Sequence, residues 1–283
     1  DFDLNDRDIE ENPTILDGNN ERRVLYQTDH FMNAFYSVWD GFTIQNGVSG
    51  AGGGAYLCSN SRLYNCRFIN NTANGFGGAV RIISAKYDNA INKIENCYFE
   101  NNIGSMGGAV FDMTGCQLIN NKFIDNTATT KGGALYIYTN KTPEIVNCIF
   151  AQNRAIEGGA IFNRGIISMV NCDIINNNAE ENAGGLLNEK QYNNIFNSVF
   201  WNNSIGNQAN QIVGTSNFVN CAIEGSFEGI NIIELGSLND GNDNKFYPMF
   251  VDPDNNNFDL MENSPLINNG DKSLNNIPDK DIN

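Results

Sequence analysis

The stretch GGALYIYTNKTPEIVNCIFAQNRAIEGGAIF, residues 132–162, begins and ends on the same Gly-Gly-Ala-aliphatic motif. The motif recurs along the chain in steps of 24, 30, 25, 26 and 26 residues. Its second glycine stands at Gly54, Gly78, Gly108, Gly133, Gly159 and Gly185, the last copy having Leu186 in place of alanine. A repeat of about 20–50 residues is typical of solenoids and propellers. The chain is therefore built from copies of one supersecondary unit.

A second motif, centred on an asparagine, recurs between the Gly-Gly-Ala copies. It reads NCRF 65–68, NCYF 96–99, NNKF 120–123, NCIF 147–150, NCDI 171–174, NSVF 197–200 and NCAI 220–223. The residue two before the asparagine and the residue three after it are apolar in every copy. Two inward side chains at this odd spacing cannot lie on one straight strand, because strand side chains alternate with period two. The chain must bend at the asparagine, which tolerates the left-handed conformation.

The asparagines also predict how the copies stack. Copies placed at a strand spacing of ~4.8 Å would turn the motif asparagines into a ladder of amides. A second column follows at Asn71, Asn102, Asn126, Asn153, Asn177 and Asn203. The Gly-Gly pairs supply a further turn, so we expect about three short strands in each unit. Propeller blades are too long for this repeat, at about 40–50 residues.

We therefore predict an all-β fold, a right-handed parallel β-helix of about eight rungs of about 25 residues each. The prediction is a single domain, 1–283. Residues 1–39 would form an N-terminal cap or irregular first rung, residues 40–225 the regular rungs, and residues 226–283 a C-terminal cap and tail, because exposed solenoid ends need a cover. We expect a monomer.

Composition and charge argue against several classes of partner. The chain carries 17 Lys and Arg against 33 Asp and Glu, a formal net charge of −16. This charge repels nucleic acids, anionic membranes and acidic polysaccharides. The apolar runs are too short to form a transmembrane helix. Residues 1–13, DFDLNDRDIEENP, show no signal-peptide pattern, so we interpret the sequence as a mature or trimmed fragment.

The cysteines and the single histidine do not indicate a metal site. Seven cysteines cannot all pair with one another, and the sequence has no CxxC motif. Five follow the motif asparagine, at Cys66, Cys97, Cys148, Cys172 and Cys221, which predicts a column of buried thiols. His30 precedes the regular rungs and is interpreted as an edge residue. The segment DPDNNN, 252–257, could hold Ca²⁺ but lacks the EF-hand spacing, so we expect a turn there and no cofactor.

The two motifs resemble those of a known family. Gly-Gly-Ala-aliphatic followed by Phe-x-x-Asn, as in GGAV/FENN and GGAI/FAQN, is similar to the repeat of the chlamydial polymorphic outer-membrane proteins and of other bacterial surface proteins with right-handed parallel β-helix repeats. The likeness covers about residues 40–225. The segment 247–271 resembles the tail of secreted bacterial proteins of the choice-of-anchor kind. The resemblance implies a secreted or outer-membrane-attached protein and often adhesion.

Two functional classes remain open. One is an adhesin-like, non-catalytic protein that binds a glycan or an extracellular protein. The other is a polysaccharide lyase or glycoside hydrolase, since parallel β-helices carry many such enzymes. A hydrolase needs two carboxylates at about 5–9.5 Å, and the candidates Asp112, Asp125, Glu157 and Glu189 fall in different columns of the repeat. The sequence therefore favours binding.

One column of the repeat suggests a binding surface. The residue after the inward aliphatic position should point outward. The expected column is Leu57, Arg81, Phe111, Tyr136, Phe162 and Asn188. We predict ligand binding by Arg81, Phe111, Tyr136 and Phe162, as an exposed aromatic strip beside an arginine. The polar loops SAKYDNAINK, 84–93, and NEKQYNN, 188–194, are further candidates for specificity.

Overall fold

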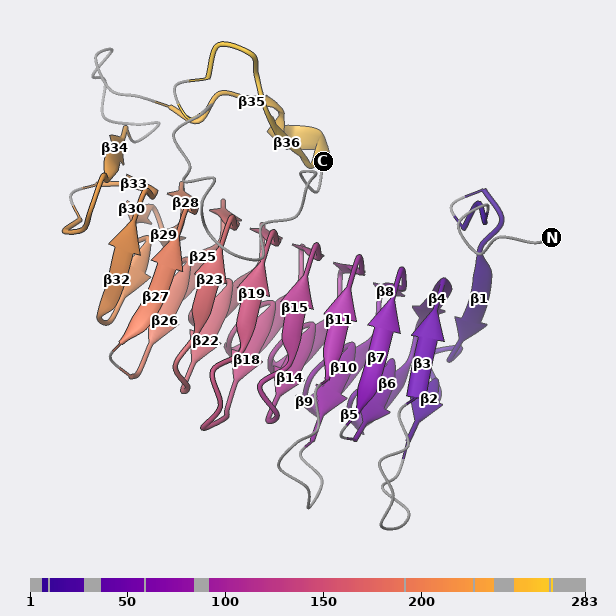
Figure 1. Ribbon diagram of the computed structural model, residues 1–283. Helices are drawn as coiled ribbons and strands as arrows, with labels where there is room; N and C mark the ends of the chain where they lie inside the picture. Colours follow the sequence, from indigo (N-terminus) through magenta and orange to yellow (C-terminus); the bar gives the residue numbers. More distant parts are fainter. Residues whose placement is uncertain are drawn as a thin grey trace.

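The computed structural model confirms a parallel β-helix. It describes residues 7–9, 11–27, 37–58, 60–83, 92–190, 192–225, 227–236, 247–264 and 266. Four sheets run along a rod in which successive turns of the chain lie side by side, as the row of strands in Figure 1 shows. Pairing between successive turns is parallel, while β29 (Ser204–Ile205) and β30 (Gln208–Ala209), which follow each other within one turn, form a short antiparallel pair.

The strands divide among the four sheets as follows. Sheet A contains β1 (Thr14–Asp17), β4 (Phe42–Gln45), β8 (Arg67–Ile69), β12 (Tyr98–Glu100), β16 (Lys122–Ile124), β20 (Ile149–Ala151), β24 (Asp173–Ile175), β28 (Val199–Trp201), β33 (Ala222–Glu224) and β34 (Ile233–Leu235). Sheet B contains β2 (Leu25–Tyr26), β6 (Ala55–Leu57), β10 (Val80–Ile82), β14 (Val110–Asp112), β18 (Leu135–Ile137), β22 (Ile161–Asn163), β26 (Leu186–Asn188) and β31 (Ile212–Val213). Sheet C contains β3 (Ser37–Asp40), β7 (Ser61–Tyr64), β11 (Lys93–Glu95), β15 (Gln117–Ile119), β19 (Glu144–Val146), β23 (Ser168–Val170), β27 (Asn193–Phe196) and β32 (Ser216–Val219). Sheet D contains β5 (Val48–Ala51), β9 (Thr72–Phe76), β13 (Ile103–Met106), β17 (Thr127–Lys131), β21 (Arg154–Glu157), β25 (Asn178–Asn182), β29 (Ser204–Ile205) and β30 (Gln208–Ala209).

Each turn holds four strands, so the expectation of about three was wrong. The chain passes through the sheets in the order A, D, B, C, and then returns to A. Repeated residues mark three of the four corners: an asparagine between C and A, a second asparagine between A and D, and Gly-Gly between D and B. The corner between B and C carries no repeated residue, which is why the pattern did not reveal it.

The interior is filled by the predicted columns. Phe68, Phe99, Phe123 and Phe150 are fully buried, and successive rings stack with centroids 5.0, 4.8 and 4.7 Å apart. All seven cysteines are buried and free, as the column of thiols predicted for five of them. Burial raises the pKa of the Cys116 thiol well above its usual range. These thiols act as small apolar side chains of the core.

The second asparagine column forms a continuous buried ladder. Asn126 shows the pattern: its Nδ2 donates to Asn153 Oδ1 at 3.0 Å and to the Phe99 carbonyl at 3.0 Å, and its backbone N–H donates to the same Asn153 Oδ1 at 2.9 Å. Asn71, Asn102, Asn153 and Asn177 repeat this pattern toward the next turn. Every member from Asn71 to Asn203 is fully buried. The ladder satisfies both a side-chain amide and a backbone N–H at the same corner of each turn.

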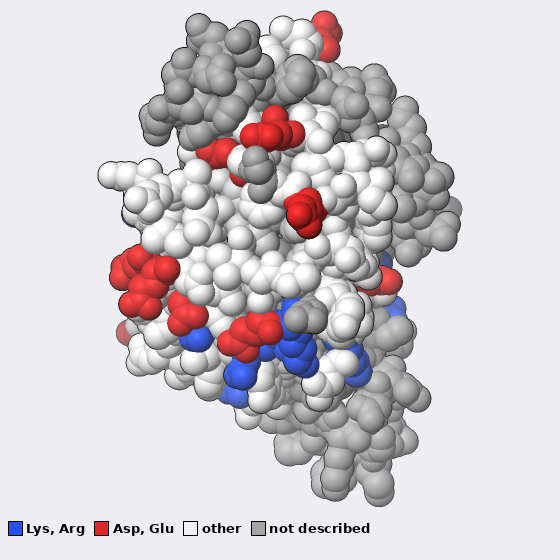
Figure 2. All heavy atoms as spheres, turned by 90° about the vertical axis from the view of Figure 1, so that its left-hand side faces the viewer, with Lys and Arg blue, Asp and Glu red and all other residues white. Residues whose placement is uncertain are grey.

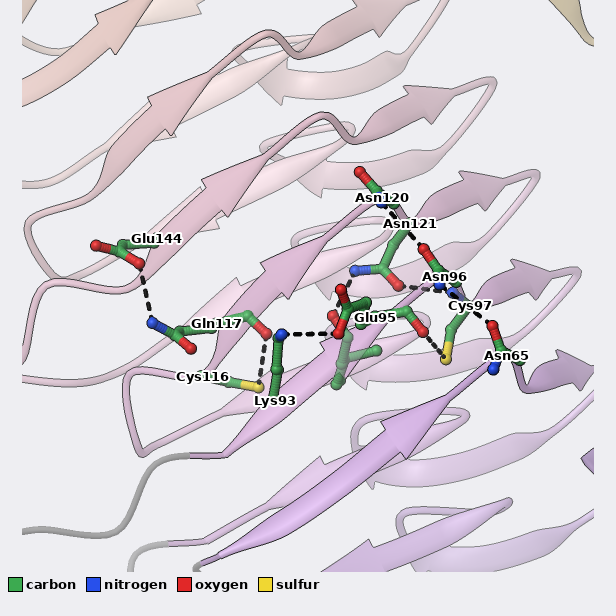
Figure 3. Close-up of polar contacts among 11 residues, drawn as sticks. Asn65, Lys93, Glu95, Asn96, Cys97, Cys116, Gln117, Asn120, Asn121 and Glu144 are labelled. Atoms are coloured by element: carbon green, nitrogen blue, oxygen red, sulfur yellow. Dashed lines mark hydrogen bonds and ion pairs between the residues drawn. The ribbon is translucent and has the colours of Figure 1, made fainter. Parts of the chain in front are cut away.

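The first asparagine column takes the predicted left-handed conformation but lies nearer the surface. All seven motif asparagines, from Asn65 to Asn220, have φ between 48° and 54°. Nδ2 of Asn96 donates to Asn65 Oδ1 at 3.2 Å, and Nδ2 of Asn120 donates to Asn96 Oδ1 at 3.0 Å (Figure 3). Asn147 continues this chain of amides to Asn120 at 2.9 Å. Because Asn96 is exposed, this ladder contributes less to stability than the buried one.

The Gly-Gly corner needs glycine at both positions, for different reasons. The first glycine has a left-handed backbone, with φ of 69° at Gly107. The second lies against the next turn, since a Cβ on Gly108 would stand 2.0 Å from the Gly133 carbonyl oxygen. Neither position accepts another residue without moving the backbone.

The C-terminal region packs beside the rod. β34 adds a last strand to sheet A, and β35 (Phe250–Asp252), η2 (Pro253–Asn255) and β36 (Asn257–Leu260) form a separate hairpin. Phe250 and Phe258 of the hairpin pack with Ile175 and Trp201 of sheet A. The hairpin thus covers outward apolar side chains of sheet A. It is the yellow segment above the row of strands in Figure 1.

The buried ladder generates a prediction about stability. Asn177→Ala should lower the free energy of unfolding by about 1–3 kcal/mol or more, because it removes four hydrogen bonds of a fully buried amide. Asn178→Ala is the matched control, since its half-buried amide contacts Ser204 and Gly206 near the surface. Urea unfolding of both variants checks this. Equal midpoints for the two variants would contradict it.

The free thiols generate a second prediction. Protein denatured without reductant should yield seven titratable thiols, because adjacent turns hold these side chains in parallel within the core. A titration with Ellman's reagent in guanidinium chloride measures the number. Recovery of a single thiol, the result for three disulfides, would refute the prediction.

Candidate functional site

The outer face of sheet B carries one continuous column of side chains. Strand pairing places Tyr26, Tyr56, Arg81, Phe111, Tyr136, Phe162, Leu187 and Val213 in register. The outward column predicted from the sequence was right in its centre and wrong at both ends. Leu57 and Asn188 lie one position further along their strands, where they are buried. Tyr56 and Leu187 take the places that these two residues were expected to fill.

The aromatic strip is stacked but not exposed, so that expectation was also wrong. The ring centroids of Phe111 and Tyr136 are 5.0 Å apart, and those of Tyr136 and Phe162 are 5.1 Å apart, with nearly parallel planes. The three residues are only 4%, 4% and 0% exposed. Rings of neighbouring turns cover their faces, and Met106, Met113 and Val213 pack around them. Lys131 Nζ lies over the Phe162 ring, 4.4 Å from its centroid.

Next to this strip, the corner between sheets B and C opens into a groove. The groove has a volume of about 420 Å³. It is lined by Met113, Tyr138, Thr139, Asn140, Arg164, Glu189 and Lys190. These residues belong to the loops that follow β14, β18, β22 and β26, so four successive turns contribute to it. We call it the corner groove.

An ion pair beside an exposed ring forms the centre of the corner groove. Arg164 Nε donates to Glu189 Oε2 at 2.6 Å, and the Arg164 guanidinium lies 5.2 Å from the Tyr138 ring centroid. A hydrogen bond to Tyr136 and the nearby Glu189 carboxylate raise the pKa of Arg164. Tyr138 is 47% exposed. The strip and the groove are therefore connected, because Tyr136 helps to hold Arg164.

A second contact joins the loops across the groove. Lys190 Nζ donates to Asn140 Oδ1 at 3.4 Å. The lining thus combines two cations, one carboxylate, an amide and a hydroxyl around a tyrosine ring. In Figure 2, which faces the end of the rod near β34, the Lys and Arg side chains gather mainly in the lower half, beside Asp and Glu.

Buried polar groups beneath the groove fix its loops. Nδ2 of Asn163 donates to Asn188 Oδ1 at 2.8 Å and to Asn193 Oδ1 at 3.1 Å, and Gly165 N donates to Asn163 Oδ1. Two turns earlier, the buried Asp112 accepts hydrogen bonds from Thr114 and from Cys116 N. Burial raises the pKa of Asp112, against the opposing effect of these hydrogen bonds. The groove therefore rests on ordered loops.

The other carboxylates named from the sequence do not meet. Asp125 is exposed, and partial burial raises its pKa although Arg154 lowers it. Glu157 pairs with Lys131 at 3.1 Å on sheet D. Glu189 is the member of this set that lines the corner groove. Residues 84–91 of one candidate loop and His30 lie outside the described residues, whereas the loop 188–194 contributes to the groove.

The described ranges contain neither a metal-ligand cluster nor a membrane-spanning helix. No group of three or more His, Cys, Asp or Glu side chains there could hold a metal ion. At 252–257 the chain forms the expected turn, in which Asn255 Nδ2 donates to Asp252 Oδ2 at 2.8 Å. No helix in these ranges is long and apolar enough to cross a membrane.

Comparison with known proteins assigns the repeat. The model of the Chlamydia polymorphic membrane protein repeat matches residues 65–82 and 122–138. These two segments of the chain are similar to that repeat. Both matched segments begin at or just after a motif asparagine and include a strand of sheet A. The resemblance inferred from Gly-Gly-Ala-aliphatic and Phe-x-x-Asn is confirmed.

Two relatives share part of the chain. It is 34% identical over 133 residues to "Probable outer membrane protein pmp15" of Chlamydia pneumoniae, covering 38% of this chain and 13% of that protein. It is 31% identical over 148 residues to "Metabotropic glutamate receptor-like protein R" of Dictyostelium discoideum, covering 50% of this chain and 9% of that protein. The chain thus spans a small part of the length of these relatives. No solved structure matches it.

Sequence reasoning missed Tyr138 and Arg164. Both lie at the unmarked corner, two positions beyond the outward residues Tyr136 and Phe162. The signal that could have found them is variation in loop length. The loops 113–116, 138–143 and 214–215 hold four, six and two residues, whereas the asparagine corners are constant in length. Variable loops on a regular scaffold are where binding residues concentrate.

The network beneath the groove generates a prediction. Asn163→Ala should speed amide hydrogen exchange in 164–167, because it removes the acceptor of Gly165 N and two links to the next turn. Unfolding stability should fall by about 1–3 kcal/mol. Asn140→Ala, in the exposed loop, is the control and should change stability by less than about 0.5 kcal/mol. Unchanged exchange in Asn163→Ala would show that the network does not hold the groove.

Proposed function

We propose that this chain is a surface-exposed β-helix that binds carbohydrate in the corner groove and does not catalyse a reaction. The observation that carries the proposal is the exposed Tyr138 ring, which stands beside the held Arg164–Glu189 pair. The surface location rests on the likeness of the repeat to that of a membrane protein family.

The chemistry of the lining suits a sugar. The C–H face of a pyranose ring packs on an aromatic ring, and Tyr138 offers such a ring with a polar tip. Sugar hydroxyls both donate and accept hydrogen bonds, and Glu189 and Asn140 supply acceptors while Lys190 supplies donors. A volume of about 420 Å³ lies within the range of small-molecule sites, at about 300–1,000 Å³.

The sequence-predicted residues enter this proposal as support for the groove. Phe111, Tyr136 and Phe162 form a stacked wall beside it, and Tyr136 holds Arg164. The three rings do not line the corner groove themselves, and their faces are occupied by neighbouring rings. Arg81 lies nearer the N-terminal end of the same column.

The geometry of the groove favours binding over hydrolysis. Retaining and inverting glycosidases use two carboxyl groups that flank the scissile bond. Glu189 is the one carboxylate among the residues that line the corner groove, and it is paired with Arg164 at 2.6 Å. A carboxylate committed to an arginine serves better as a hydroxyl acceptor than as a proton donor.

The proposal predicts the effect of removing the ring. On a glycan array, Tyr138→Ala should lose about 1 kcal/mol of binding free energy, which is about fivefold in affinity, because the sugar loses its stacking partner. Tyr64→Ala, a half-buried tyrosine of sheet C, is the matched control and should bind like the wild type. Binding that survives in Tyr138→Ala would move the site elsewhere, and binding to proteins but to no glycan would refute the carbohydrate proposal.

A turnover assay separates binding from catalysis. The protein is incubated with neutral and acidic polysaccharides, with and without Ca²⁺, while new reducing ends and the absorbance of unsaturated products are followed. We expect no product. Turnover of any polysaccharide would overturn the non-catalytic part of the proposal.

A further inference from the structure

Two arginines and two tyrosines form a cluster near the N-terminal end of sheet B, on the turns that precede those lining the corner groove. The Arg23 guanidinium lies 5.0 Å from the Tyr26 ring centroid and 5.1 Å from that of Tyr56. Arg81 lies 5.3 Å from the Tyr56 centroid. One ring therefore contacts both cations. We call these four residues the arginine–tyrosine cluster.

The two guanidinium groups are held in place by different contacts. Arg23 Nε donates to the Gly52 carbonyl at 2.9 Å, and its Nη2 donates to Ser49 Oγ and to the Ala51 carbonyl. Arg81 is fixed by rings alone, with Phe76 at 4.9 Å and Phe111 at 5.9 Å in addition to Tyr56. The guanidinium groups of Arg23 and Arg81 thus have fixed orientations before a ligand binds.

Neither cation has an acidic partner in the described part of the chain. The ion pairs found there join Asp or Glu to Arg7, Arg22, Lys93, Lys131 and Arg164. Arg81 Nε is buried without a hydrogen-bond acceptor. Arg23 and Arg81 thus lie close enough to repel each other, without a carboxylate between them, in a chain of net charge −16.

The cluster is accessible. Tyr26 is 63% exposed and Phe76 is 36% exposed, while Tyr56, Arg23 and Arg81 are half-buried. A ligand can therefore reach the guanidinium groups between two open rings. Burial, together with the nearby Arg81, lowers the pKa of Arg23, although Tyr26 and Tyr56 oppose this. A bound anion would relieve the repulsion between the cations.

We propose that the arginine–tyrosine cluster binds a sulfate or carboxylate group of an acidic polysaccharide. Guanidinium forks pair with such oxyanions through two parallel hydrogen bonds, and Arg81 has its N–H donors available for this. The open rings of Tyr26 and Phe76 offer apolar faces for the sugar that carries the charged group. This local positive site lets a protein of net charge −16 hold an acidic polymer that its overall field repels.

The test measures binding by the full chain with three hexasaccharides of equal length, one sulfated, one made of uronic acid and one neutral. We expect binding of at least one acidic hexasaccharide, weakening as salt is raised, and none of the neutral one at this cluster. The sulfated and uronate samples decide which oxyanion the cluster takes. A sulfotyrosine peptide that binds more tightly than either acidic sugar would overturn the saccharide assignment.

Substitutions locate the binding. Arg81→Gln should lose about tenfold or more in affinity, and Arg81→Lys should lose less, because it keeps the charge but not the fork. The matched control is Arg67→Gln on sheet A, where a guanidinium also lies 5.2 Å from a tyrosine ring and Nε is likewise without a partner. Arg23→Gln tests the second cation, and Arg81→Gln remains decisive if Arg23→Gln fails to fold, since Arg23 holds the backbone of Ala51 and Gly52.

The outcomes separate this site from the corner groove. Tyr138→Ala should bind the acidic hexasaccharide with unchanged affinity even if it has lost its own glycan. Unchanged affinity in Arg81→Gln, an equal loss in Arg67→Gln, or a loss confined to Tyr138→Ala would each overturn the proposal. Thermal melting of every variant confirms that the β-helix is intact.

Discussion

The buried asparagine ladder is the constraint on which the rest of the structure depends. Each ladder residue donates toward the next turn from both its side-chain amide and its backbone N–H, so all these hydrogen bonds point to the C-terminal end of the rod. The series ends on Gln211, whose Nε2 donates to the buried carboxylate of Glu224 at 2.7 Å. Aligned hydrogen bonds polarise one another, and a negative charge at the accepting end suits this direction. A one-residue slip at any turn would leave several buried polar groups unsatisfied.

The ladder also explains where the molecule can vary. The asparagine corners and the Gly-Gly corner are fixed in length by hydrogen bonds and by close backbone contacts between turns. The corner between sheets B and C has no such link in the repeat, so its loops change in length from turn to turn without disturbing the stack. The corner groove lies there. Three corners of constant length thus hold the stack together, and the loops at the fourth corner are free to differ in length and sequence.

Much of the fold could be predicted from the sequence because the repeat displays it. Inward columns, left-handed asparagines and the Gly-Gly turn each follow from a residue type that recurs at a fixed step, and each is found in the structure. The fourth strand could not be predicted, since nothing repeats at its corner. The predicted aromatic strip does form one column on the outer face of sheet B, but the expected exposure of Phe111, Tyr136 and Phe162 was wrong. Alternation along a strand gives the direction of a side chain, whereas burial depends on neighbours such as Met106 and Lys131, which come from another sheet.

Amide hydrogen exchange tests the central claim most directly, because it reports on the ladder and on the variable corner in one experiment. The backbone N–H groups of Asn102, Asn126 and Asn153 donate to buried side-chain oxygens of the next turn. We predict that they exchange among the slowest in the protein, through global unfolding, while the amides of Thr139 and Asn140 exchange orders of magnitude faster. Similar rates at the two corners would show that the ladder does not hold the β-helix together, and would contradict this account.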